Sequence, residues 1–227
     1  MGLVLNLIIQ TIAWFGVMGA IIFFAAGTTN YIGGWLYLGI MVGLAVLMGA
    51  HIMHVDPGLL RERLKPPLQK DQPLADKLII IPILLVIFGG MGFMAADAAR
   101  WHWSRVPLFV QLAGCAFLLG VMWFMYWVMR VNTFAAPVVK IQRERGQEVI
   151  TTGAYALVRH PLYFGALFYI AATSLVLGSW WGLLAVPVLA LLFGIRIGIE
   201  EKTLRLGLDG YDDYARRVRW RLIPFIW

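Results

Sequence analysis

The chain has 227 residues, of which 61% are hydrophobic and only 14% are charged. Its mean hydropathy of +0.78 is far above that of a water-soluble domain, whose residues are roughly half apolar and a quarter charged. These values exclude an ordinary soluble enzyme and a disordered chain. Because Cys115 is the single cysteine, they also exclude a disulfide-framed secreted module. We therefore expect an all-α, polytopic integral membrane protein.

Apolar segments follow one another along the chain in lengths that suit membrane helices. A bilayer core of about 30 Å takes roughly 20 apolar residues of helix. The first run lacks the basic start and the cleavage pattern of a signal peptide, so we expect a retained helix. The fifth run is near the lower length limit, and it forms either a full span or part of a tilted hairpin. The prediction is about six membrane helices, possibly five, from the runs 3–26, 31–55, 78–96, 108–129, 161–177 and 180–199.

The distribution of the basic residues indicates how these helices are oriented in the membrane. With six crossings, sixteen of the nineteen Lys and Arg residues fall on one side of the membrane. The opposite side holds only Arg100 and Arg105, and the last span holds Arg196. The positive-inside rule therefore predicts cytoplasmic termini, in the inner membrane if the cell is prokaryotic. The positive charge indicates membrane lipids as partners rather than nucleic acid.

We interpret residues 1–141 as a transmembrane scaffold of four helices and residues 142–227 as a catalytic region, because charged and aromatic residues there adjoin short apolar helices. Pro161 suits the first position of a helix and disfavours helical geometry at His160. Arg159 and His160 would then lie at a helix N-terminus, which favours an anion. Gly165 would allow a ligand or another backbone to approach closely.

Two further groups of residues follow in the last third of the chain. Arg196 and Glu200 are four residues apart and share a helix face, whereas Glu201 points about 140° away from Arg196. An ionisable residue this deep in a membrane is a functional candidate, although an arginine can also extend to the headgroups. The aromatic and basic segment 211–224 is either an interfacial anchor on anionic lipid or a lid over a site.

These motifs together resemble the isoprenylcysteine carboxyl methyltransferase family and its phospholipid N-methyltransferase relatives. The resemblance covers roughly residues 142–227, and the compact chain is similar to prokaryotic members. It implies a membrane fold in which S-adenosylmethionine occupies a cytoplasm-facing pocket and a lipophilic or lipidated acceptor enters from the bilayer. It rests on the Gly153-x-Tyr155 approach, the Arg159-His160-Pro161-x-Tyr163-x-Gly165 motif, the Arg196 helix with Glu200 and Glu201, and the tail from Tyr211 and Tyr214 to Leu222-Ile223-Pro224.

The resemblance also implies roles for individual residues. Arg196 and Glu201 match a functional pair five residues apart, and Glu200 and Arg159 join them as catalytic candidates. No metal site is expected. The residues expected to bind the cofactor are Gly153, Tyr155, His160, Pro161, Tyr163, Gly165, Tyr211 and Tyr214.

The class of acceptor stays open at this stage. A carboxylate is already a nucleophile at neutral pH and needs only an orienting cation, for which Arg196 is suited. A phosphatidylethanolamine amine would arrive protonated and need a base such as Glu200 or Glu201. Carboxyl O-methylation is favoured by the family resemblance.

Other classes of protein remain as alternatives. A sterol-reductase-like membrane enzyme that uses NADPH resembles the same C-terminal motif. A transport or assembly subunit is the alternative without catalysis, although paired repeats and midplane charges are absent from the sequence. His51 and His54 are too few for a histidine-rich di-iron site, and we expect them at an interfacial helix end.

Overall fold

The computed structural model describes residues 2–70 and 72–227, and this part of the chain contains helices and no strands. The prediction of an all-helical membrane protein is confirmed, and each of the six predicted runs is helical. Five helices are long and apolar enough to cross a membrane, whereas the 16-residue α6 is shorter. The α-helices are α1 (Leu3–Ala26), α2 (Ile32–Val55), α3 (Pro57–Arg63), α4 (Leu74–Ala95), α5 (Leu108–Val131), α6 (Pro161–Val176), α7 (Ala185–Gly207) and α8 (Tyr211–Arg217). The π-helix η1 (Ala96–Trp101) extends α4, and the short 3-10 turns are η2 (Arg143–Arg145), η3 (Gly153–Ala156) and η4 (Trp181–Leu184).

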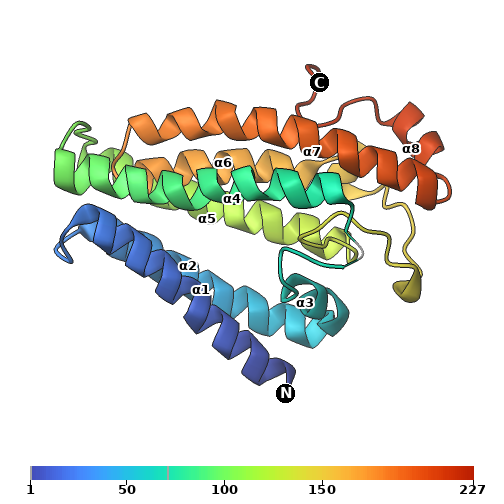
Figure 1. Ribbon diagram of the computed structural model, residues 1–227, viewed down its shortest axis with the longest axis horizontal. Helices are drawn as coiled ribbons and strands as arrows, with labels where there is room; N and C mark the ends of the chain where they lie inside the picture. Colours follow the sequence, from blue (N-terminus) through green and yellow to red (C-terminus); the bar gives the residue numbers. More distant parts are fainter. Residues whose placement is uncertain (1, 71) are drawn as a thin grey trace.

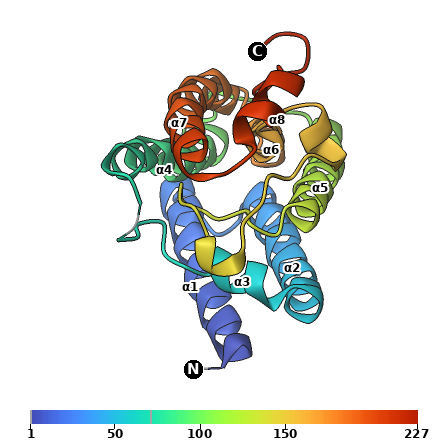
Figure 2. The ribbon, with the colours of Figure 1, turned by 90° about the vertical axis from the view of Figure 1, so that its right-hand side faces the viewer.

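The long helices run alternately in opposite directions (Figure 1). Helices α4 to α7 lie side by side, and the pair α1 and α2 packs against α4 and α5 at an angle. The short helices α3 and α8 and the irregular segment between α5 and α6 gather at one end of the bundle, which faces the viewer in Figure 2. This end therefore carries most of the polar chain, and the long helices lead into it.

The apolar residues divide between a packed interior and an outer surface suited to lipid. Leu118, Leu189 and Ile197 are fully buried between helices. Phe24 and Leu191 are mostly exposed on the outside of the bundle. A helix satisfies its own backbone hydrogen bonds, so such a surface can face hydrocarbon.

Two glycines bring α6 close to α5. A Cβ atom on Gly165 would lie 2.6 Å from Cγ of Met125, and one on Gly114 would lie 2.8 Å from Cβ of Leu175. Each distance is shorter than a carbon–carbon van der Waals contact of about 3.5–4.0 Å. The close approach expected at Gly165 is therefore a contact with a side chain of α5, which fixes the start of α6.

The start of α6 is also held by the C-terminal tail. Pro161 is the first residue of the helix, and His160 precedes it in a non-helical conformation, as the sequence predicts. The backbone N–H of Arg159 donates to the carbonyl of Trp220 at 2.9 Å, and that of His160 donates to the carbonyl of Arg221 at 2.9 Å. The tail thus positions the residues that lead into α6.

Candidate active site

A cavity of about 410 Å³ lies at the polar end of the bundle and extends between the helices. We call it the main cavity. Its apolar part includes Trp14 of α1, Ile83 and Ile87 of α4, Met125 of α5 and Ala166 of α6. Its polar part includes Asn132, Tyr155, His160, Glu200 and Tyr211. A cavity with a long apolar wall and a few polar groups at one end suits a lipophilic ligand with a polar head.

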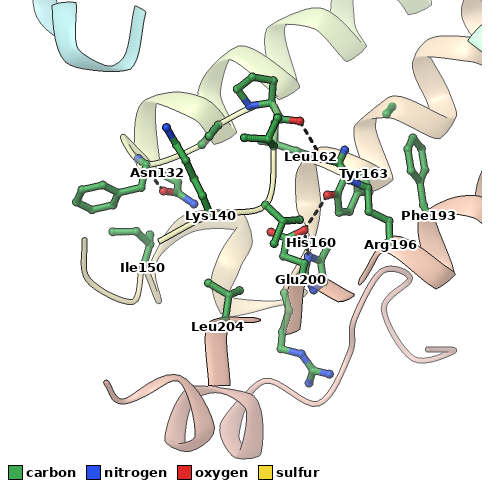
Figure 3. A pocket seen from close by; sticks show the side chains of 18 of the residues that line it. Asn132, Lys140, Ile150, His160, Leu162, Tyr163, Phe193, Arg196, Glu200 and Leu204 are labelled. Atoms are coloured by element: carbon green, nitrogen blue, oxygen red, sulfur yellow. Dashed lines mark hydrogen bonds and ion pairs between the residues drawn. The ribbon is translucent and has the colours of Figure 1, made fainter. Parts of the chain in front are cut away.

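Eight of the residues predicted for the site line the main cavity, and four do not. His160, Tyr163, Arg196 and Glu200 gather on one wall, across from Asn132, Lys140 and Ile150 (Figure 3). The eight lining residues are Tyr155, Arg159, His160, Tyr163, Arg196, Glu200, Tyr211 and Tyr214. The four that lie outside the lining are Gly153, Pro161, Gly165 and Glu201.

Glu200 and Tyr163 form the centre of that wall. The Tyr163 hydroxyl donates a hydrogen bond to Oε2 of Glu200 at 2.7 Å, and the same oxygen lies 3.8 Å from Nδ1 of His160. The Tyr163 ring stacks between His160 and Phe193, with centroid distances of 5.7 and 4.9 Å. Of the two adjacent glutamates, Glu200 is therefore the one that faces the main cavity.

Glu201 lies outside the cavity lining and binds two residues of that wall, Arg159 and His160. Its side chain is 5% exposed and pairs with Nε of Arg159 at 2.7 Å, with Nε2 of His160 at 3.3 Å and with Nε of Arg221 at 3.3 Å. Arg159 also donates to the carbonyl of Val218 at 2.7 Å. A carboxylate with three basic partners joins α7 to the α6 motif and to the tail. Its contacts are those of a group that positions Arg159 and His160.

Arg196 is engaged by a residue that the sequence analysis did not select. Its Nε donates to Oδ1 of Asp76 at 2.8 Å, and its Nη2 donates to the carbonyl of Pro137 at 2.8 Å. Asp76 is fully buried and also accepts from the Gln72 side chain and from the backbone N–H of Val139. The charge of Arg196 is thus already neutralised by α4. The expected role of Arg196 as a free cation for the acceptor receives no support from this geometry.

The short helix α3 is attached to the same end of the bundle by a cluster of charges. Glu62 forms ion pairs with Lys140, at 2.6 Å, and with Lys65. Burial alone would raise the pKa of Glu62, but hydrogen bonds and charges from Lys140 and Lys65 outweigh burial and lower it. The cluster fixes α3 against the segment between α5 and α6, and Arg63 of α3 lines the main cavity.

Three buried tyrosines close the polar part of the cavity. Burial raises the pKa of Tyr155, Tyr211 and Tyr214, so each hydroxyl keeps its proton at neutral pH. Tyr214 donates to the carbonyl of Tyr155 at 2.8 Å, and Tyr155 accepts from Asn132 at 3.0 Å. The Tyr211 hydroxyl is buried and has no hydrogen-bond partner within residues 2–70 and 72–227. Helix α8 therefore contributes Tyr211 and Tyr214 to the cavity lining, with an unused donor on its inner side, and its function as an interfacial anchor or as a lid stays a prediction.

The sequence analysis missed Asp76, Asn132 and Arg63, because it treated the first 141 residues as scaffold. The sequence did contain a reason to look for Asp76, because an arginine inside an apolar helix, here Arg196, needs a carboxylate partner. Asp76 stands just before an apolar run, where such a partner could be sought. Nothing in the sequence pattern distinguishes Arg63 from the other basic residues of its loop.

Comparison with known proteins gives the same assignment for the C-terminal part of the chain. The family model described as phospholipid methyltransferase matches residues 109–206. Protein-S-isoprenylcysteine O-methyltransferase B of Arabidopsis thaliana is 34% identical over 90 residues, which cover 39% of this chain and 45% of that protein. A probable protein-S-isoprenylcysteine O-methyltransferase of Oryza sativa subsp. indica is 38% identical over 92 residues, 39% of this chain and 47% of that protein. The matched segment thus spans less than half the length of these curated relatives.

The fold as a whole also has a counterpart. The solved structure of the eukaryotic intramembrane Ras methyltransferase, an isoprenylcysteine carboxyl methyltransferase, aligns with a TM-score of 0.54 and 19% identity. The alignment covers 95% of this chain and 75% of that one. The alignment shows that the two proteins share an all-helical membrane fold. The chain is thus similar in sequence to protein-S-isoprenylcysteine O-methyltransferases over about 90 residues, and its fold is similar to that of the solved isoprenylcysteine carboxyl methyltransferase.

Proposed function

We propose that this protein is an integral membrane methyltransferase that transfers a methyl group from S-adenosylmethionine to the carboxylate of a lipophilic acceptor of the S-prenylated cysteine type. One observation carries the proposal: a single cavity joins an apolar channel between helices to a polar end lined by His160, Tyr163 and Glu200. The curated relatives named as isoprenylcysteine O-methyltransferases support the same reaction.

The polar end of the cavity fits S-adenosylmethionine. A sulfonium cation is favoured by aromatic faces and by a nearby carboxylate, and Tyr155, Tyr163 and Glu200 supply these groups. The unpartnered hydroxyl of Tyr211 is a donor available to a polar group of the cofactor. His160, Tyr155, Tyr211 and Tyr214 would hold the cofactor, and Glu200 would lie near its positive charge. Gly153, Pro161 and Gly165 would act by shaping the backbone around them.

Methylation of a carboxylate requires little acid–base chemistry from these residues. The cofactor supplies an electrophilic methyl group: a carboxylate oxygen of the acceptor forms the new C–O bond while the C–S bond breaks and its electron pair stays on sulfur. No proton moves, so orientation and exclusion of water are the main contributions of the chain. Tyr163 and Phe193 pack the wall beside the site, and α8 covers it. Arg159, Glu201 and Arg196 keep His160, Glu200 and Tyr163 in place.

A second candidate is amine N-methylation, which the family model's description as phospholipid methyltransferase favours. A protonated amine must lose a proton before it attacks. Glu148 and Glu200 both line the cavity, and Glu200 is the one on the wall with His160 and Tyr163. The acceptor chemistry therefore distinguishes the two candidates. For either acceptor, we propose that the polar end of the bundle faces the cytoplasm, with both termini on that side.

The test uses the full chain purified in detergent. We expect saturable calorimetric binding of S-adenosylhomocysteine and none of NADPH, with binding weakened by His160→Ala. His54→Ala is the matched control, because His54 is exposed and outside the cavity lining. Methyl transfer from labelled S-adenosylmethionine is then compared between an S-farnesyl N-acetylcysteine and phosphatidylethanolamine vesicles. Binding of NADPH alone would indicate a reductase, and transfer to the amine alone would replace the carboxylate proposal.

A further inference from the structure

Arg63, at the end of α3, has no ionic partner within residues 2–70 and 72–227, whereas the other cations that line the main cavity are paired. Arg159 pairs with Glu201, Arg196 with Asp76, and Lys140 with Glu62. Arg63 also lines the main cavity, but no carboxylate of the described residues lies within ion-pair distance of it. The groups that act on its charge are Tyr155, Arg196 and Tyr163. The guanidinium of Arg63 is therefore left with its donors available.

The surroundings of Arg63 are those of a ligand site. Its side chain is exposed, and part of that exposed surface lines the cavity. Desolvation lowers its pKa, the nearby Tyr155 opposes this effect, and the charge of Arg196 adds to it. Arg63 is thus in contact with solvent on one side and lines the cavity on the other. A guanidinium with open donors on the lining of a largely apolar cavity is suited to bind an anion through charge-assisted hydrogen bonds.

We propose that Arg63 binds the carboxylate of the methyl acceptor. This inference rests on the proposed function and names the group that would select the substrate class. Arg63 lines the same cavity as Tyr163, whose ring stacks on Phe193 and lies under the guanidinium of Arg196, where the apolar channel meets the polar end. The head of an acceptor whose prenyl chain fills the channel would lie at that junction. A planar guanidinium matches a carboxylate through two parallel hydrogen bonds.

The position of Arg63 in the chain favours the acceptor over the cofactor as the source of the anion. The residues proposed to hold the cofactor all come after residue 150. Arg63 comes from the N-terminal half, outside residues 109–206 that match the family model. The N-terminal half also supplies Trp14 and the α4 residues of the apolar channel. One half would thus hold the methyl donor, and the other would hold both ends of the acceptor.

The decisive measurement compares binding of an acid with that of its uncharged methyl ester. The full chain in detergent is titrated by calorimetry with S-farnesyl N-acetylcysteine and with the corresponding methyl ester, with S-adenosylhomocysteine present. We expect the acid to bind roughly tenfold to a hundredfold more tightly than the ester, as for a charge-assisted hydrogen bond. Arg63→Gln should abolish this preference, and Arg63→Lys should retain part of it. Arg61→Gln, on the same helix but outside the cavity lining, should leave it unchanged.

Kinetics then separate this inference from the proposed function. In Arg63→Gln, we expect KM for the acid to rise by roughly tenfold or more, with KM for S-adenosylmethionine unchanged. A loss of S-adenosylhomocysteine affinity instead would mean that Arg63 holds the donor's carboxylate, which overturns the inference. Equal binding of acid and ester by the unmodified protein, or binding of neither, also overturns it. Lack of methyl transfer with the binding preference intact would refute the function and leave Arg63 as an anion-binding residue.

Discussion

The ion pair between Asp76 and Arg196 should dominate the stability of the polar end of the bundle. Asp76→Asn keeps the shape of the side chain but removes the charge that neutralises Arg196. The Asp76 side chain is fully buried and that of Arg196 is 9% exposed, so the guanidinium would be left in a desolvated site. Breaking one partner of a buried ion pair typically costs roughly 3–5 kcal/mol. For a chain of this size that corresponds to a fall in melting temperature on the order of 10 °C.

The assay is thermal unfolding of the purified chain in one detergent at one pH, followed by intrinsic fluorescence. The double variant Asp76→Leu with Arg196→Met replaces both charges by apolar groups, and we expect it to recover most of the lost stability. A double-mutant cycle should give a coupling energy of roughly 2 kcal/mol or more. The single variants of this cycle are Asp76→Leu and Arg196→Met. A loss of stability below about 1 kcal/mol in each of them, with no coupling, would show that the pair does not hold α4 to α7.

The remaining predictions concern the cavity wall, the α5–α6 contact and the α3 cluster. Glu200→Gln should lower kcat with little change in melting temperature. Glu201→Gln should lower the melting temperature because three basic partners lose their carboxylate. The same change in melting temperature in both variants would contradict this prediction. Gly165→Ala should destabilise by roughly 1–3 kcal/mol in the same unfolding assay, while Gly43→Ala, in open space, should not. The lowered pKa of Glu62 means that its contribution to stability is complete above the ordinary pKa of 4.5 and is lost as pH falls through the lowered value. The difference in melting temperature between the unmodified chain and Glu62→Gln should therefore disappear in acid, and a difference that persists there would refute this assignment.

The helices could be predicted from the sequence because they depend on local properties. Runs of about 20 apolar residues identify the spans, and the 16-residue α6 was expected to be the short one. Pro161 likewise indicated the start of α6, because its fixed backbone geometry acts on its own neighbours. Local chemistry of this kind needs no knowledge of the tertiary fold.

The partners of the charged residues could not be predicted in the same way. Arg196 and Glu200 share a helix face, yet Arg196 pairs with Asp76, 120 residues away, and Glu200 with Tyr163. Glu201, one position further, lies behind the wall and pairs with the α6 motif. Such pairing depends on which helices are neighbours and on how each is rotated about its axis. Spacing along one helix gives neither quantity.

The division of the chain into a scaffold (residues 1–141) and a catalytic region (residues 142–227) stays a prediction, but residues of both parts line the main cavity. Trp14, Arg63 and Ile83 all line the main cavity, and Asp76 fixes Arg196 beside it, so α1, α3 and α4 contribute to the site as well as to the bundle. The segment that matches the family model begins only at residue 109. Under the proposed function, such an enzyme could keep one site for the methyl donor and change its acceptor through the residues that the N-terminal helices contribute to the cavity. The residues that select the acceptor should therefore lie outside the sequence motifs proposed to bind the methyl donor, and Arg63 is the first of them to test.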